Sequence, residues 1–212
     1  MNDAVHMGYR SVATHATYEK VIRKSRFIAD IFAVQNEDET IAALEQVKKR
    51  HPEARHICYA YKHGVDGEVV RFSDAGEPAG TAGRPILEVL ERSDLHCTLI
   101  TVTRYFGGIL LGAGGLVRAY ASTAAGVVAA AEITRYEWHL ACALTVDYSA
   151  WSRVERLLRE AGYRYADVRY DVRVSCTCLV QPQALPGLTK LLQDATGGQT
   201  VIEPTPAGYH PV

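Results

Sequence analysis

The chain has 212 residues, of which 48% are hydrophobic and 22% charged, a composition typical of a soluble globular protein with one large domain or two small ones. Lysine and arginine total 23 against 24 aspartate and glutamate, so the formal net charge is −1. This balance excludes a global electrostatic attraction to nucleic acid, and any such binding needs a local basic patch.

Five cysteines are scattered along the chain, and their odd number favours reduced thiols over a disulfide framework. The first ten residues have no apolar core, so no signal peptide is expected. The longest weakly polar stretch, residues 119–131, is too short and too rich in alanine to span a membrane. We therefore expect a soluble, cytoplasmic protein with no membrane partner.

Loose alternation of apolar residues over 18–34 predicts a first strand. Its basic residues are Lys20, Arg23, Lys24 and Arg26. They fit either a solvated strand edge or a phosphate-binding strip. Asn36 and Glu39 then form a capping box that opens a helix, which Pro52 ends.

Further along, residues 56–61 alternate as a strand, and a turn joins them to the run 68–72 in a predicted hairpin. A helix is expected to begin at Pro85. The β-branched run 97–106 predicts a buried strand. A glycine-rich turn leads from it into a helix over 113–131.

The pattern changes near residue 135. The predicted elements are a strand over 138–148, a helix over 150–161, two strands within 163–180, a helix over 182–195 and a strand over 199–203. This β-α-β-β-α-β order is the ferredoxin-like plan. The tail from Pro204 is expected to trail on the surface. We predict a two-domain α+β protein, with domains over 1–135 and 136–212.

Two glycine-rich segments, residues 72–87 and 100–120, contain eight of the 17 glycines, between Gly76 and Gly115. Such density implies tight turns, or backbone brought close to another group. The polar side chains inside these segments are few and specifically placed, which is typical of a binding surface.

In the second segment, a turn opens a helix and leaves several backbone N–H groups free at the helix N-terminus. The glycines of this turn are Gly107, Gly108, Gly112, Gly114 and Gly115. These groups attract phosphate or carboxylate, and Arg104 and Arg118 would add charge-assisted hydrogen bonds. The alternative is that the glycines only allow helix and sheet to approach closely, with Arg118 paired internally. The segment is not a Walker loop, because no Lys-Ser or Lys-Thr follows the last glycine.

The first segment carries Asp74 and Glu77. Two carboxylates three residues apart could ligate Mg²⁺ or act as a general base. The alternative is a structural role, in which Asp74 caps turns of the loop and Pro78 fixes a bend, or in which the loop contacts a partner.

Other candidates are weaker. His56 could point toward the site across the sheet, or it could be structural. Tyr105 and Phe106, beside Arg104, could stack bases as in single-strand binders, although we expect at least one of the two in the core. The thiols of Cys176 and Cys178 share one strand face, but no partner motif completes a zinc site. No serine has a readable His-Asp arrangement.

Four segments together resemble the YigZ/IMPACT family: KSRFIA at 24–29, HICYAY at 56–61 and the two glycine-rich segments, of which TRYFGGILLGAGGLVRAY is long and idiosyncratic. The resemblance covers nearly the whole first domain. The remainder looks like the second domain of the bacterial members. This chain departs from the family at Ala75, where a second acidic residue is usual, at Ala79, where serine is common, and at Leu110, where lysine is common.

The resemblance implies a first domain similar to the second domain of a small-subunit ribosomal protein, and a second domain similar to the carboxyl-terminal domain of elongation factor G. Eukaryotic relatives are translational regulators that compete for an activator of the general amino-acid control kinase. For bacterial members it suggests binding to nucleic acid or ribosomes. Fold kinship alone does not carry function.

The sequence therefore predicts a non-enzymatic, translation-associated regulatory protein that binds RNA, a ribosome or a protein partner through the glycine-rich loops of its first domain. No cofactor, resident metal or DNA specificity is expected. The alternative is an enzyme that acts with Mg²⁺ on a phosphorylated small molecule or nucleotide.

Overall fold

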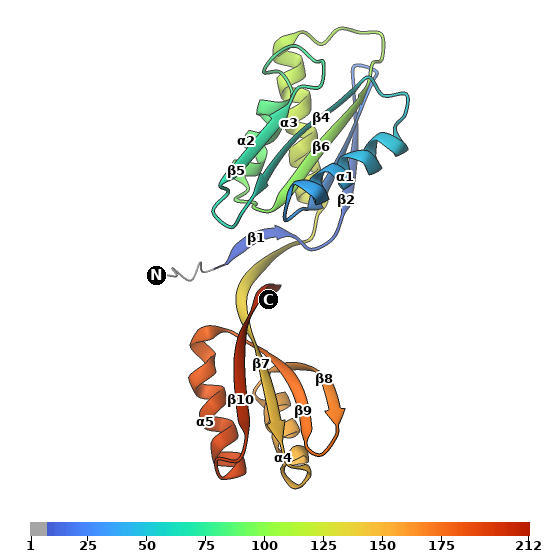
Figure 1. Ribbon diagram of the computed structural model, residues 1–212. Coiled ribbons are helices and arrows are strands. Elements are labelled where there is room, and N and C mark those ends of the chain that lie inside the picture. Colours follow the sequence, from blue (N-terminus) through green and yellow to red (C-terminus); the bar gives the residue numbers. More distant parts are fainter. Residues whose placement is uncertain (1–7) are drawn as a thin grey trace. The chain divides into compact units, whose positions relative to one another are not determined.

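The computed structural model describes residues 8–212, which form two compact units (Figure 1). The first unit is Tyr9–Tyr136, and the second contains Glu137–Val212. The boundary expected between residues 135 and 136 lies one residue before this division.

A five-stranded antiparallel sheet in the order β2-β3-β6-β4-β5 organises the first unit. Its strands are β2 (Ala16–Ile22), β3 (Ser25–Ala33), β6 (Thr98–Tyr105), β4 (His56–His63) and β5 (Val69–Ser73). The predicted hairpin of β4 and β5 is present. β6 is the central strand and is buried along nearly its whole length, which explains its continuous apolar and β-branched sequence.

Helices cover both faces of this sheet (Figure 1). α1 (Glu37–Arg50) packs on one face, where Val47 and Leu99 belong to a small core. α2 (Gly83–Arg92) and α3 (Ala113–Ala130) pack on the other face around the larger core, which includes Tyr120.

Asn36 caps α1 as predicted, but Glu39 reaches back to Gln35 and not to the N–H of Asn36 as in a standard capping box. The backbone N–H of Glu39 donates to the side chain of Asn36 at 3.0 Å, and the Glu39 carboxylate accepts from the N–H of Gln35 at 2.8 Å. The first bond satisfies an N–H group that lacks a partner within the helix, and the second ties the residue before Asn36 to the first turn.

Residues 18–34 were expected to be one strand, and this is wrong. They form most of the hairpin β2–β3, which turns at Arg23 and Lys24 with φ of 45° and 67°. The turn lacks the asparagine and glycine that normally mark such positive-φ positions, so the sequence pattern did not predict it. A short strand, β1 (Tyr9–Val12), was also not expected; it pairs with the beginning of β7.

The second unit has the predicted ferredoxin-like order. Its elements are β7 (Ile133–Val146), which begins in the first unit, α4 (Tyr148–Glu160), β8 (Arg164–Tyr170), β9 (Val174–Val180), a 3-10 turn (Pro182–Ala184), α5 (Leu185–Thr196) and β10 (Val201–Pro211). β9 lies between β7 and β8, and β10 pairs with β7. Leu158 and Leu188 from the two helices pack on the sheet in one core.

The expectation of a trailing tail from Pro204 is wrong, because the last strand runs on to Pro211. Proline lacks a donor but is tolerated on edge strands, where its missing N–H faces away from the ladder.

All five cysteines are free and buried. Cys176 and Cys178 share a face of β9, and burial raises their pKa values to about 11 and 12. No helix in residues 8–212 combines the length and apolar character that crossing a membrane requires.

Candidate functional site

Asp74, in the first glycine-rich segment, accepts hydrogen bonds from three backbone N–H groups. Gly80 donates to Oδ2 at 2.8 Å, and Ala82 and Gly83 donate to Oδ1 at 2.9 and 2.8 Å. Burial raises the pKa of this carboxyl, but the three hydrogen bonds outweigh it, so the pKa is lowered overall. Since Gly83 is the first residue of α2, Asp74 caps that helix as well as ordering the loop.

Glu77 lies inside the first unit. Its Oε1 accepts from Nη1 of Arg104 and from the Tyr120 hydroxyl, each at 2.7 Å. The Glu77 side chain is 3% exposed and that of Arg104 is 7% exposed. Burial also raises the pKa of Tyr120, which keeps its proton on the phenol. The carboxylate, the guanidinium and the hydroxyl form one internal network.

Both predicted carboxylates are thus bonded within the protein, and they face different partners. In the part of the chain that the structure describes, no three His, Cys, Asp or Glu side chains converge as metal ligands would. The contacts of Asp74 and Glu77 are those of a loop that orders itself.

In the second segment, the structure explains why positions 107 and 112 are glycine. A Cβ at Gly107 would overlap the backbone of Lys24 in the β2–β3 turn. Gly112 precedes α3 with φ of +72°, in the left-handed region that favours glycine. Gly108 also has positive φ, and neither Gly108 nor Gly114 has other atoms near the position of a Cβ.

The N-terminus of α3 has no side-chain cap and no acidic residue in its first turn. Within residues 8–212, the backbone N–H groups of Ala113, Gly114 and Gly115 have no hydrogen-bond partner, and the first helical bond is donated by Leu116 to Gly112 at 2.9 Å. Residues 112–114 are exposed. These donors and the positive end of the helix dipole face solvent.

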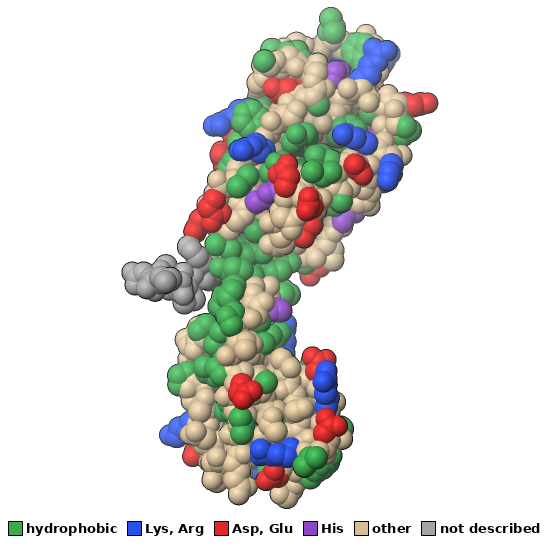
Figure 2. Space-filling view, in the orientation of Figure 1, with side chains coloured by type: hydrophobic (Ala, Val, Ile, Leu, Met, Phe, Trp, Pro, Cys, Tyr) green, Lys and Arg blue, Asp and Glu red, His purple; other side chains and the backbone are tan. Residues whose placement is uncertain are grey.

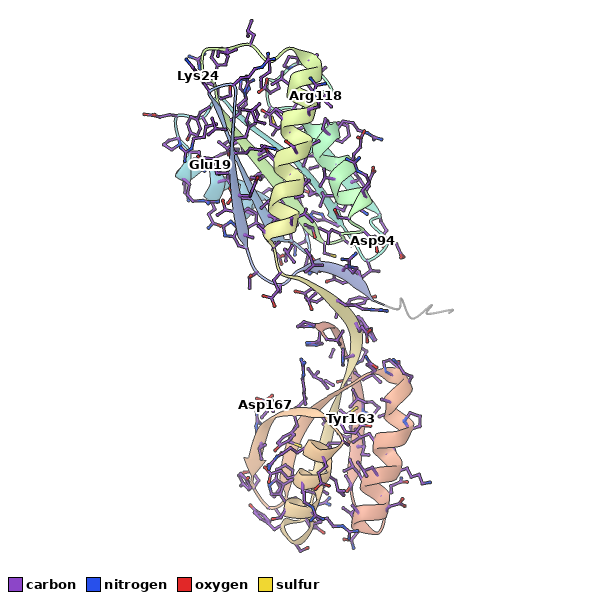
Figure 3. All side chains as sticks on the ribbon, turned by 180° about the vertical axis from the view of Figure 1, so that it is seen from behind. Glu19, Lys24, Asp94, Arg118, Tyr163 and Asp167 are labelled. Atoms are coloured by element: carbon purple, nitrogen blue, oxygen red, sulfur yellow. The ribbon has the colours of Figure 1, made fainter. Side chains whose placement is uncertain are left out.

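Basic side chains surround this helix start. Arg118 is exposed and has no hydrogen-bond or ion-pair partner among the described residues. It lines a pocket of about 250 Å³ with Arg23 and Gly115, and Figure 3 shows Lys24 at the same end of the unit as Arg118. We call the N–H groups of residues 113–115, with Arg23, Lys24 and Arg118, the α3-start surface. By contrast, basic and acidic side chains are interspersed on the face of this unit drawn in Figure 2.

Arg104 does not belong to the α3-start surface, although sequence reasoning placed it there. Its Nη1 faces Glu77, and its guanidinium lies 5.5 Å from the ring centroids of both Phe27 and Phe106. Of the two arginines expected beside α3, only Arg118 is exposed there.

A second pocket, of about 470 Å³, includes residues just before the glycine-rich turn and Leu110 within it. It is lined by Glu53, Arg55, His56, Arg104, Phe106 and Leu110, with Tyr105. We call it the His56 pocket. His56 is directly opposite Arg104 in the β4–β6 ladder, so the two side chains share a face of the sheet.

Tyr105 and Phe106 differ in their surroundings. The Tyr105 hydroxyl is 3.0 Å from Nδ1 of His51, and the Arg26 guanidinium lies over its ring. Phe106 is 57% exposed. The expectation that at least one of them is in the core is wrong, because Tyr105 is only partly buried and β6 ends there.

Sequence reasoning missed Tyr120 and Phe27, which hold the Glu77–Arg104 pair, and Arg23 as a neighbour of Arg118. Their partners are distant in sequence, so no local pattern marks them. The basic run at 20–26 was the available signal for Arg23, and one of its two interpretations was a phosphate-binding strip.

Comparison with known proteins gives consistent matches. Residues 23–128 match the model of the Impact N-terminal domain, and residues 144–199 match a domain of unknown function, DUF1949. The chain is 34% identical over 195 residues to the IMPACT family member YvyE of Bacillus subtilis, covering 92% of this chain and 90% of that protein. It is 46% identical over 110 residues to the IMPACT family member YigZ of Escherichia coli, covering 51% and 54%. A crystal structure of a hypothetical protein is similar with a TM-score of 0.64 and 31% identity, covering 92% of this chain and 96% of that one.

Proposed function

We propose, from the premise that the chain belongs to the IMPACT family, that its first unit binds RNA phosphates at the α3-start surface, free or on a ribosome, and so acts in the regulation of translation. The observation that carries the proposal is the exposed, uncapped N-terminus of α3 beside Arg23 and Arg118. Backbone donors, a positive dipole end and guanidinium groups form the combination that attracts phosphate.

The charge distribution supports a local mode of binding. With a net charge of −1 the whole chain does not attract a polyanion, so affinity depends on this small group of cations. Lys20, whose ammonium is 3.3 Å from the Ser122 hydroxyl on α3, extends the basic group along β2. Few phosphate contacts predict weak binding with a shallow salt dependence.

The five free, buried cysteines suit a reducing compartment, and we place this function in the cytoplasm as part of the proposal. A protein partner, as the family resemblance implies for the eukaryotic relatives, is the main competing occupant of the same surface. An enzyme using Mg²⁺ would require Asp74 or Glu77 to leave its internal partners, so the contacts favour binding over that chemistry.

The test is sedimentation of the full chain with ribosomes through sucrose gradients at about 50 and 200 mM salt, a range over which even a few phosphate contacts weaken measurably. We expect co-migration at the lower salt, reduced at the higher one, and loss of the interaction after nuclease treatment. Absence of co-migration and of RNA retention in both buffers contradicts the proposal. Co-purification with a protein that survives nuclease assigns the surface to a protein partner.

A further inference from the structure

We propose that the His56 pocket holds one unpaired nucleotide of the bound RNA, with the base against Phe106 and the phosphate toward Arg104 and Arg55. This inference rests on the proposed function and specifies how the bound RNA contacts the protein next to the α3-start surface. The pocket of about 470 Å³ is within the usual range for small-ligand sites.

Arg104 is held in position and retains donor capacity. Nη1 is bonded to Glu77, Nε is enclosed without a partner, and no residue in the described part of the chain accepts from Nη2. A buried guanidinium has five N–H groups, and burying it with most of them unpaired is costly. An anion in the pocket that it lines is the ligand chemistry that fits such a group.

His56 is oriented by the backbone. Its Nδ1 lies 3.0 Å from the carbonyl oxygen of Ala75, and because a carbonyl only accepts, Nδ1 must carry the proton. The other ring nitrogen, Nε2, has no partner in residues 8–212 and is the one left for a ligand. With the proton on Nδ1, Nε2 is an acceptor to which a ribose hydroxyl or a base amino group can donate. Arg55, on the same pocket wall, adds a second guanidinium.

Apolar groups line the same pocket and are unusually exposed. Phe106 is 57% exposed and Leu110 is 81% exposed. An exposed aromatic ring next to a fixed guanidinium is the arrangement on which single-stranded bases stack. Glu53, the one carboxylate in the pocket lining, can only accept, so it suits a ribose hydroxyl or a base amino group and not the phosphate.

The pocket and the α3-start surface are adjacent in the chain. Leu110 lines the His56 pocket, and Leu111 lines the pocket that contains Arg23 and Arg118. An RNA strand whose phosphates lie on the α3-start surface would cross the turn 107–112 to place a base in the His56 pocket. This continuity favours an RNA strand over a free nucleotide.

The experiment measures fluorescence anisotropy of a labelled single-stranded RNA of about 12 nucleotides, the size of a typical single-strand site. Phe106→Leu keeps an apolar side chain but removes the stacking face, and we expect roughly 5–150-fold weaker binding with an unchanged salt slope. Phe106→Trp should restore affinity. Phe72→Leu is the matched control, because Phe72 is also exposed but lies on β5 and does not line the pocket. This variant should bind RNA as the unmodified chain does.

The outcomes separate the two proposals. If the unmodified chain binds no RNA, the proposed function fails and this inference fails with it. If it binds, and Arg118→Gln weakens binding while Phe106→Leu does not, only the nucleotide pocket is wrong. A nucleoside monophosphate that competes as well as the RNA would assign the pocket to a free nucleotide and overturn the RNA source. Circular dichroism checks that each variant folds.

Discussion

The two glycine-rich segments of the first unit share a high glycine content and a few polar residues, but the polar groups before α2 and those at the start of α3 differ in what they contact. In residues 72–87, Asp74 and Glu77 are bonded to backbone N–H groups, to Arg104 and to Tyr120. In residues 100–120, Arg104 and Tyr120 are the partners of Glu77, but between them the first N–H groups of α3 and the Arg118 side chain have no partners in the described chain. Glycine with polar residues indicates a tight turn in both, and the hydrogen-bond partners decide which one is open to a ligand.

The glycines divide within each segment: Gly83 and Gly107 lie against neighbouring backbone, whereas Gly80 and Gly114 have open space where a Cβ would be. A Cβ at Gly83 would come 2.8 Å from the backbone of Ser73, so this glycine permits close packing. Gly112 and Gly114 have open space around them. Close packing explains Gly83 and Gly107, whereas it does not explain why the start of α3 is bare.

The largest expected effect is that of Glu77→Ala, because it leaves the buried guanidinium of Arg104 without its carboxylate. We expect a loss of about 3–5 kcal/mol of stability. Urea unfolding followed by far-ultraviolet circular dichroism measures it, and fluorescence of Trp138 and Trp151, both in the second unit, serves as an internal reference. Glu88→Ala, which breaks an exposed pair with Arg84, should cost at most about 1 kcal/mol. Equal losses in the two variants would refute the network.

Gly107→Ala comes next. The new methyl group overlaps backbone of the β2–β3 turn, which a side-chain rotation cannot relieve. We expect about 3 kcal/mol of destabilisation, the upper end for overpacking. Gly114→Ala, in open space at an ordinary φ, is the control and should be neutral or stabilising by up to about 1 kcal/mol. A neutral Gly107→Ala would show that the approach to Lys24 is not tight.

Asp74→Asn should cost about 1.5 kcal/mol at neutral pH, since asparagine keeps one acceptor oxygen but loses the charge. The folded pKa of Asp74 lies below its ordinary value of 3.8, so its contribution is present above about pH 4 and is lost as the pH falls through the folded value. The difference in unfolding free energy between the two proteins should therefore shrink in acid. A difference that stays constant from neutral pH to below pH 4 would contradict the charge-assisted capping.

Much of the fold was predictable because local patterns agree with it. β6 is central and covered on both faces, so its sequence is continuously apolar, and Asn36 with Glu39 marks the start of α1. The turn at Arg23 and Lys24 was not predictable, because it uses positive φ without glycine. The prolines after residue 203 gave a false signal, since an edge strand tolerates them.

The candidate site was predictable only in part. The bare start of α3 follows from local sequence, because no capping or acidic residue is present there. The partner of Arg104, by contrast, cannot be predicted from the local sequence. Arg104 pairs with a glutamate 27 positions away, and the choice between that partner and the helix start is made by the register of β3, β6 and β4.

The most direct test of the α3-start surface is the salt dependence of RNA binding by Arg118→Gln. This variant should change stability by less than about 0.5 kcal/mol, because the side chain is exposed and unpaired in the described structure. We predict weaker binding at every salt concentration and a slope of log K against log salt smaller by about 0.7. Arg71→Gln, at an exposed arginine on β5, should leave both quantities unchanged. An Arg118 variant that is indistinguishable from the Arg71 variant would contradict the account.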